Sequence, residues 1–182
     1  MLTVVAPDRP GLFSRVAGVL SLHGLGVLSA DAISSDDGMA LEHFRVQPPR
    51  DEPIDWTRVT ADLDRALAGR LAVRARLADR ARTYARTGRK PVVAPARVLT
   101  DNGASAGATV LEVHAPDAIG VLFRITRALA ELDVDIRTAK VQTLGDTVID
   151  AFYVRGPDGA KIDDPAHIAE LERAVLHAVN NG

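Results

Sequence analysis

The chain of 182 residues contains one segment twice, and this duplication constrains its fold more than any other feature. The segment "APDRPGLFSRV" at residues 6–16 returns as "APDAIGVLFRI" at residues 115–125, with an offset of 109 residues. The apolar pattern repeats with the same offset, at every second residue before the segment and at every fourth residue after it. Because these periods are typical of a half-buried strand and of one helix face, the sequence predicts two copies of one unit.

Each copy continues with the same order of elements. We expect strands at 2–6, 27–34 and 39–46 with helices at 11–23 and 56–68, and then strands at 109–115, 134–143 and 147–155 with helices at 120–132 and 166–179. Gly24 and Asp133 follow the first helices and tolerate the left-handed conformation common at helix C-termini. The order β-α-β-β-α predicts an α+β fold of two ferredoxin-like βαββαβ units, each an antiparallel sheet with its helices on one face.

A βαββαβ unit also needs a fourth strand. The candidate for the first copy is Arg97–Asp101, with Val92–Ala94 as the alternative, and no room is left for a strand after the second copy. We therefore divide the chain into a first domain core (1–70), a basic helical and Pro-containing linker with the candidate strand (71–108), and a second domain (109–182). A sheet edge without its last strand can pair with another chain, so this organisation allows a homodimer.

The linker begins with a basic helical stretch. Residues 70–90 hold eight Lys and Arg residues against Asp79 alone, a net charge of +7. Runs of like charge most often form a solvated face, and docking onto an acidic domain is the next interpretation. Nucleic-acid binders usually add exposed aromatic side chains for stacking, and only Tyr84 lies nearby.

The repeated turn is the candidate binding site. A helix N-terminus exposes unpaired amide groups that can hold a carboxylate, and Gly11 lets a ligand approach the backbone closely. Asp8 can accept hydrogen bonds from an ammonium group. These groups complement a free amino acid. The competing interpretation is structural, because Asp is a frequent N-cap residue and Pro is favoured in the first helical turn.

Composition excludes several other classes of protein. The net charge of −2 gives no overall attraction to nucleic acid or to an acidic membrane surface, and no apolar run approaches the roughly 20 residues of a membrane span. We therefore expect no nucleic-acid partner and no membrane partner. The chain has no Cys and no recognisable signal peptide, which predicts a cytoplasmic protein.

No catalytic residue and no metal ligand is predicted in this chain. It lacks a Gly-Ser dipeptide, an adjacent His-Asp pair and a Gly-rich phosphate loop, and its five His residues are scattered. The pairs Asp62/Asp64 and Asp133/Asp135 have the spacing of metal carboxylates but no convergent further ligands.

The two copies resemble ACT domains, which are small amino-acid-sensing regulatory modules. The segments "RVLTDNGASAGATVLEV" (97–113) and "VQTLGDTVIDAFYVRGPDGAKI" (141–162) narrow the resemblance to the tandem ACT region at the C-terminus of bacterial protein-PII uridylyltransferase/uridylyl-removing enzymes. For ligand binding, the resemblance implies the turn and helix start of each copy: Asp8, Gly11, Leu12 and Phe13 in the first, and Asp117, Gly120, Val121 and Leu122 in the second.

The resemblance further implies glutamine, or another small amino acid, as the effector in nitrogen-status signalling. The catalytic domains of the same parent chain would use Mg and a nucleoside triphosphate, and the parent enzyme would act on the PII signal protein. The alternative is a free-standing tandem ACT regulator that works by oligomerisation and partner binding. Since the second copy reads "DAIG" where the first reads "DRPG", we expect unequal sites, with the first the better one.

Overall fold

The fold is known from a computed structural model, which describes residues 1–48, 53–85 and 95–181. In this part the strands are β1 (Leu2–Pro7), β2 (Gly26–Ser34), β3 (Met39–Gln47), β4 (Arg97–Asp101), β5 (Thr109–Pro116), β6 (Asp135–Leu144) and β7 (Thr147–Arg155). The helices are α1 (Leu12–Leu22), α2 (Trp56–Leu67), α3 (Val73–Ala85), α4 (Val121–Glu131) and α5 (Pro165–Asn180). The expected α+β elements are confirmed, with ends that differ by one or two residues.

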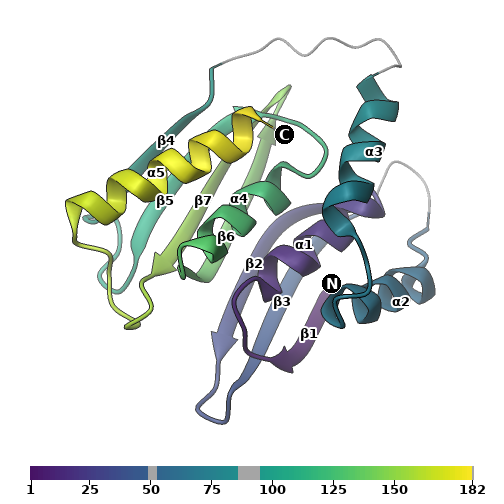
Figure 1. The fold of residues 1–182 in the computed structure, drawn as a ribbon, viewed down its shortest axis with the longest axis horizontal. Coiled ribbons are helices and arrows are strands. Elements are labelled where there is room, and N and C mark those ends of the chain that lie inside the picture. The colour runs from purple at the N-terminus through teal and green to yellow at the C-terminus, as the bar shows by residue number, and fades with distance from the viewer. Residues whose placement is uncertain (49–52, 86–94, 182) are drawn as a thin grey trace.

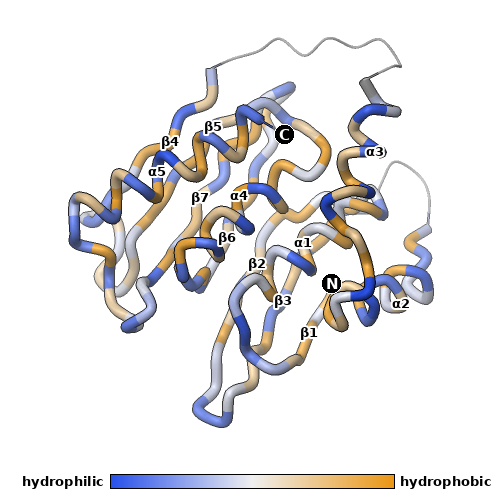
Figure 2. The backbone as a smooth tube through the Cα atoms, viewed as in Figure 1, coloured by the Kyte–Doolittle hydropathy of each residue, from blue (hydrophilic) through white to orange (hydrophobic). Residues whose placement is uncertain are grey.

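The described strands form a single antiparallel sheet of seven strands in the order β1-β3-β2-β6-β7-β5-β4. Helices α1, α4 and α5 lie side by side over one face of this sheet (Figure 1). The strands and the two central helices carry much of the hydrophobic colour, whereas the turn at 35–38 is hydrophilic (Figure 2). None of the helices in the described part combines the length and the apolar character that a bilayer span needs.

The two units are joined through both layers of the fold. In the sheet, β2 pairs with β6 from Ser29–Lys140 to Asp31–Thr138. In the helical layer, α1 packs against α4 at Gly18, where an added Cβ would lie 2.8 Å from the Phe123 ring. The apolar residues that repeat every four positions, such as Val16 and its counterpart Ile125, are fully buried here. Burial of such a side chain stabilises the fold by about 1.5–3 kcal/mol.

The fourth strand belongs to the second unit, so our assignment of Arg97–Asp101 to the first unit was wrong. β4 pairs antiparallel with β5, from Arg97–His114 to Asp101–Val110. The strand that precedes the second copy in the sequence is therefore the fourth strand of that copy. The alternative strand at 92–94 lies outside the described residues. Within the described part, β1 pairs only with β3 and β4 pairs only with β5, so these two strands form the edges of the sheet.

A hydrogen-bond network explains why β4 joins the second unit. The Asn102 side-chain amide donates to the Ile162 carbonyl at 2.9 Å and accepts from the Thr109 hydroxyl at 2.7 Å. The Lys161 ammonium donates to the carbonyls of Asn102 and Ser105. These bonds fasten the β4–β5 loop to the segment between β7 and α5. The "DNGAS" motif at 101–105 thus has a structural role at the end of β5 opposite the repeated turn.

Candidate functional site

A cavity of about 730 Å³ lies between the two units, beneath α3. The first unit contributes α1 and the segment that leads into β2, and the second unit contributes the repeated turn and the adjoining β6–β7 turn. The α3 helix contributes Arg80, Ala81 and Tyr84. The volume falls within the ~300–1,000 Å³ that small-molecule sites usually have.

All four second-copy candidates, Asp117, Gly120, Val121 and Leu122, line this cavity. Gly120 is the N-cap of α4 with φ 76°, and no side chain caps that helix start. The same holds for Gly11, which precedes α1 with φ 80°. The interpretation of Asp8 and Asp117 as helix caps is therefore wrong. In each copy the N-cap position is instead occupied by a glycine in the left-handed conformation. The start of the second helix, α4, forms part of the cavity wall.

The second turn is fixed by contacts from three elements. The Asp117 amide donates to the Asp146 carbonyl at 2.9 Å, which joins the two turns. The Gly120 amide donates to the Ser21 hydroxyl of α1 at 3.1 Å. A Cβ on Gly120 would lie 3.3 Å from the Leu77 side chain of α3. Because the turn is held in this way, the first-turn amides and the positive end of α4 have a fixed place beside the cavity, and both favour an anion.

The floor of the cavity is acidic. The Asp150 side chain is fully buried, and neither carboxylate oxygen has a hydrogen-bond partner of good geometry among the described residues. Burial raises the pKa of Asp150 to about 7, the Gln142 backbone amide opposes this rise, and the charge of Asp117 adds to it. Desolvation, followed by the charge of Asp146, also raises the pKa of Asp117.

The cation that lines the cavity in the described part is Arg80 of α3. Its guanidinium donates to the Leu22 carbonyl at the end of α1, at 3.1 Å. The cavity thus combines two kinds of groups. The carboxylates of its floor suit a cation, whereas the start of α4 and the Arg80 guanidinium suit an anion.

The first-copy candidates lie elsewhere. Asp8 is exposed at its turn, whereas Leu12 and Phe13 are core residues, with the Phe13 ring 5.0 Å from that of Phe44. None of them, and not Gly11, lines the cavity between the units. The structure therefore brings together the second set of candidates and not the first.

The first unit nevertheless has its own buried acid. Glu42 pairs with Val4 as Asp150 pairs with Val113, so the two acids occupy equivalent strand positions. Glu42 is 3% exposed, and burial raises its pKa to about 8, with smaller contributions from the charges of Asp8 and Asp135. Unlike Asp150, Glu42 does not line the cavity.

Two differences distinguish the turns. Ser21, whose hydroxyl accepts from the second turn, corresponds in the repeat to Ala130, which has no hydroxyl. Asp146, whose carbonyl accepts from the Asp117 amide, corresponds to Gly38, whose carbonyl accepts from the Asp8 amide at 2.8 Å. The second turn therefore has the Ser21 hydroxyl and the Asp146 side chain beside it, whereas the first turn has the Ser14 hydroxyl, which donates to the Gly11 carbonyl at 2.9 Å.

Sequence reasoning missed Asp150, Asp146 and Arg80. Asp150 lies in the quoted segment 141–162, at an inward position of β7 between Val148 and Phe152, which are both buried. The signal that could have identified Asp150 is an acidic residue at an inward position of a strand whose other inward residues are apolar. Arg80 belonged to the basic stretch, but its place beside the second turn depends on how α3 packs.

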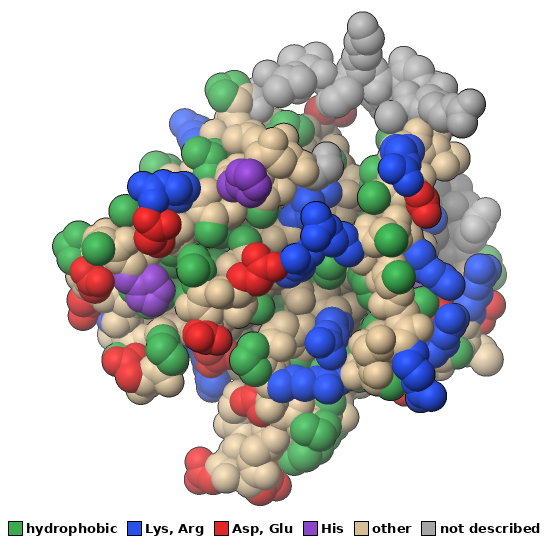
Figure 3. Space-filling view, viewed as in Figure 1, with side chains coloured by type: hydrophobic (Ala, Val, Ile, Leu, Met, Phe, Trp, Pro, Cys, Tyr) green, Lys and Arg blue, Asp and Glu red, His purple; other side chains and the backbone are tan. Residues whose placement is uncertain are grey.

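The α3 helix is amphipathic. Val73 and Leu77 are buried against the fold, and the arginines of the helix, 74, 76, 80 and 82, are exposed. Lys and Arg side chains gather over α3 and α2 on one side of the molecule (Figure 3). The exposed arginines form a basic face on this helix, which agrees with either a solvated face or a docking face, while the rest of the stretch, from residue 86, lies outside the described residues.

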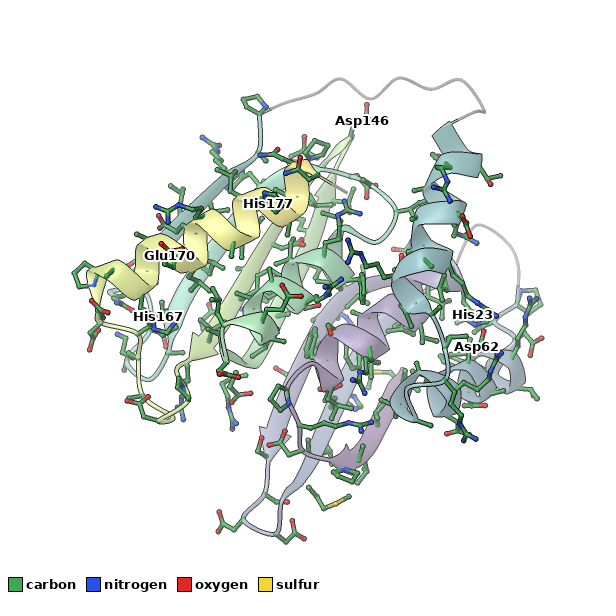
Figure 4. The ribbon with its side chains drawn as sticks, viewed as in Figure 1. His23, Asp62, Asp146, His167, Glu170 and His177 are labelled. Atoms are coloured by element: carbon green, nitrogen blue, oxygen red, sulfur yellow. The ribbon has the colours of Figure 1, made fainter. Side chains whose placement is uncertain are left out.

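Some of the residues considered as metal ligands have other partners. His23 and Asp62 face each other at 3.2 Å, and Asp62 also binds Arg65 (Figure 4). Asp146 lies apart from them at the β6–β7 turn, and His167 and His177 lie on α5 (Figure 4). Across residues 1–48, 53–85 and 95–181, no group of three or more His, Asp or Glu side chains could hold a metal ion.

Comparison with known proteins identifies the repeated unit. The family model for the ACT domain matches residues 1–66 and 109–175. The relatives of this chain include bifunctional uridylyltransferase/uridylyl-removing enzymes, and that of Gluconobacter oxydans is 36% identical over 99% of this chain. Those of Azospirillum brasilense and Streptomyces coelicolor are 35% identical over 98% and 40% identical over 92% of it.

The chain spans only about a fifth of these relatives, namely 19%, 20% and 21% of their lengths. The similarity is to their regulatory C-terminal region rather than to their catalytic part. The chain belongs to the ACT domain family and carries two ACT domains.

Proposed function

We propose that this chain is an amino-acid-binding regulatory module and that its ligand occupies the cavity between the two units. The main support for this proposal is that the cavity is lined by groups that bind an anion and by groups that bind a cation. The start of α4 and Arg80 suit a carboxylate, and the acidic floor at Asp150 suits an ammonium group. A free amino acid carries both groups on one carbon atom.

Glutamine is the amino acid that we propose first. The similarity to uridylyltransferase/uridylyl-removing enzymes supports it, together with the effector that the sequence resemblance implies. Ser21 and Thr143 also line the cavity, and their hydroxyl groups can bind a side-chain amide. In the parent enzyme the module would report nitrogen status to catalytic domains that modify the PII signal protein, and the whole protein would work in the cytoplasm.

The two glycine turns provide a matched pair of variants for testing this site. Gly11 and Gly120 have nearly the same positive φ, so a valine at either position strains the backbone similarly. We expect Gly120→Val to abolish binding, because it changes the turn that lines the cavity. Gly11→Val should retain most of the affinity. This order reverses our expectation from the sequence, which favoured the first turn.

Calorimetry of the 182-residue chain with a panel of amino acids is the direct test. Binding of glutamine, or of another small amino acid, with an affinity that depends on Gly120 supports the proposal. Absence of both binding heat and thermal stabilisation with every amino acid would refute it. Equal loss in the two glycine variants would place the ligand elsewhere.

The alternative of a free-standing regulator rests on β1, one of the two edge strands of the sheet. In the described part β1 has a partner strand on one side only, and an unpaired edge can receive a strand from a second copy. Sedimentation equilibrium tests this homodimer. A monomer at all protein concentrations excludes this form of the alternative, whereas a dimer that dissociates on substitution of Val5 by proline supports it.

A further inference from the structure

Asp150 is an acidic residue at an inward position of β7, where apolar side chains are expected. The inward positions of β7 on either side of it hold Val148 and Phe152, which are 3% and 0% exposed. Asp150 itself is 0% exposed, and neither carboxylate oxygen has a hydrogen-bond partner of good geometry among the described residues, although the Gln142 backbone amide favours its ionised form. A buried ionised carboxylate without a partner is strongly unfavourable. Such a group needs either a bound proton or a cation from outside the fold.

The surrounding elements supply no cation for Asp150. The ionisable side chains that line the cavity with it are Asp117 and Asp146 at the two turns, and Arg80 and Tyr84 on α3. Arg80 donates to the Leu22 carbonyl. On α4, the Arg124 guanidinium donates to the Ile119 and Ala178 carbonyls. The α1 and β2 residues that line the cavity are not ionisable. A cation that pairs with Asp150 therefore has to enter with the ligand.

We propose that Asp150 binds the protonated amine of the ligand and that ligand uptake releases the proton that the empty site holds on Asp150. This inference rests on the proposed function, since it assigns one end of the same ligand. The step is an exchange of partners. The O–H bond of the Asp150 carboxyl group breaks, its proton passes to solvent, and the carboxylate then accepts hydrogen bonds from the ammonium group, which keeps all its protons.

The titration of Asp150 sets the pH range of this exchange. Burial raises its pKa to about 7, so the empty site holds the proton below that pH. Under those conditions the affinity for an amine ligand rises by up to about tenfold per pH unit, because one proton leaves for each ligand bound. Above about pH 8 the carboxyl group is already ionised and affinity levels off. The site would thus sense an amino acid and the proton concentration together.

The test measures proton release directly. Glutamine is titrated calorimetrically into the chain at about pH 6, in phosphate and in imidazole buffer, which differ in ionisation enthalpy, and the experiment is repeated at about pH 8. The upper point is not higher because the free amino group itself loses its proton at about pH 9. We expect close to one proton released per ligand at the lower pH and only a small fraction of one at about pH 8. The analogue of glutamine that lacks the α-amino group should bind at least about tenfold more weakly, since a charged hydrogen bond is worth roughly 1.5–3 kcal/mol.

Two amide variants distinguish the role of Asp150 from a general effect of buried acids. Asp150→Asn keeps the shape of the side chain but cannot release the proton, so we expect weak binding without proton release. Glu42→Gln removes the equivalent acid of the first unit, which does not line the cavity, and should bind and release protons like the unaltered chain. Circular dichroism confirms that each variant is folded.

The outcomes separate this inference from the proposed function. Glutamine binding with no dependence on buffer ionisation, or with equal proton release by the Asp150→Asn variant, overturns the inference and leaves the function standing. Equal affinity for the analogue without an amino group does the same. Absence of binding by every amino acid overturns both.

Discussion

Replacing Glu42 with glutamine should make the stability of this fold less sensitive to pH. Glu42 lies inward on β3 beside Phe44, and its Oε2 atom is buried without a partner among the described residues. Burial is the main cause of its raised pKa, and the charges of Asp8 and Asp135 contribute less. Glutamine has nearly the shape of the protonated acid but no proton to lose, so the substitution isolates the cost of ionisation.

The direction of the effect follows from proton binding. The unfolded chain loses the Glu42 proton near the ordinary pKa of 4.5, whereas the folded chain holds it up to a pKa of about 8. Below pH 4.5 both states are protonated and the group has no effect on stability. Between these two values the unfolded state binds fewer protons, so the free energy of unfolding falls as pH rises, and it levels off above about pH 8.

The size of the effect follows from the same two values. A pKa difference of that extent is worth up to about 5 kcal/mol. Because one carboxylate oxygen of Glu42 is not among the buried unpartnered atoms, we expect hydration to reduce the cost to about 2–4 kcal/mol. The Glu42→Gln variant should thus match the unaltered chain within about 1 kcal/mol near pH 4 and exceed its stability by that larger amount near pH 9.

Urea unfolding across this pH range measures the difference. Trp56 is the only tryptophan of the chain and provides a fluorescence signal at the start of α2. Other titrating groups affect both proteins alike and cancel in the comparison. Asp150→Asn provides a second case, whose transition should end about one pH unit lower because the pKa of Asp150 is about 7. A stability difference for Glu42→Gln that is the same at acidic and at alkaline pH would refute the reasoning.

Two further substitutions test the packing. Gly18→Val should destabilise the fold by about 1–3 kcal/mol through overpacking, because a Cβ there lies 2.5 Å from the Val73 side chain and 2.8 Å from that of Phe123. Thermal unfolding measures this loss of stability, and Ala78→Val at an exposed position is the neutral control. Asn102→Leu should cost about 2–4 kcal/mol, since it leaves two partners of the Asn102 side chain unpaired. Urea midpoints show this, and unchanged amino-acid affinity is expected because this network lies at the far end of β5.

Local sequence signals predicted the elements of the fold well. The strand and helix periods, and the turns after α1 and α4, depend on neighbours in the sequence. Gly24 and Asp133 indeed have positive φ, at 72° and 54°. The partner strand of β4 could not be predicted in this way. The alternation of apolar and polar residues in "RVLTD" predicts a strand, but it fits an edge position in either unit equally well. Its choice depends on Asn102 and Lys161, which bind a segment roughly sixty residues away.

The candidate site was predictable only in part for a related reason. The repeated turn identifies Gly120 and Asp117, and an inward acid in an apolar strand identifies Asp150. However, duplication also predicts the equivalent set around Gly11 and Glu42. Within the repeat, a visible difference is Ser21 against Ala130, and its meaning depends on the contact between Ser21 and the second turn. The other deciding group, the α3 helix, comes from the linker.

The α3 helix comes from the linker and contacts both units, and it contributes to the cavity beside the second turn. Its Val73 side chain packs at Gly18 of α1, and its Leu77 side chain packs at Gly120. The α3 helix therefore contacts both α1 of the first unit and the turn at Gly120 of the second unit. A ligand that shifts the second turn must also shift α3 or strain these contacts. Since α3 leads into the segment before β4, the first effect of binding would reach the connection between the two units rather than the edge strand β1.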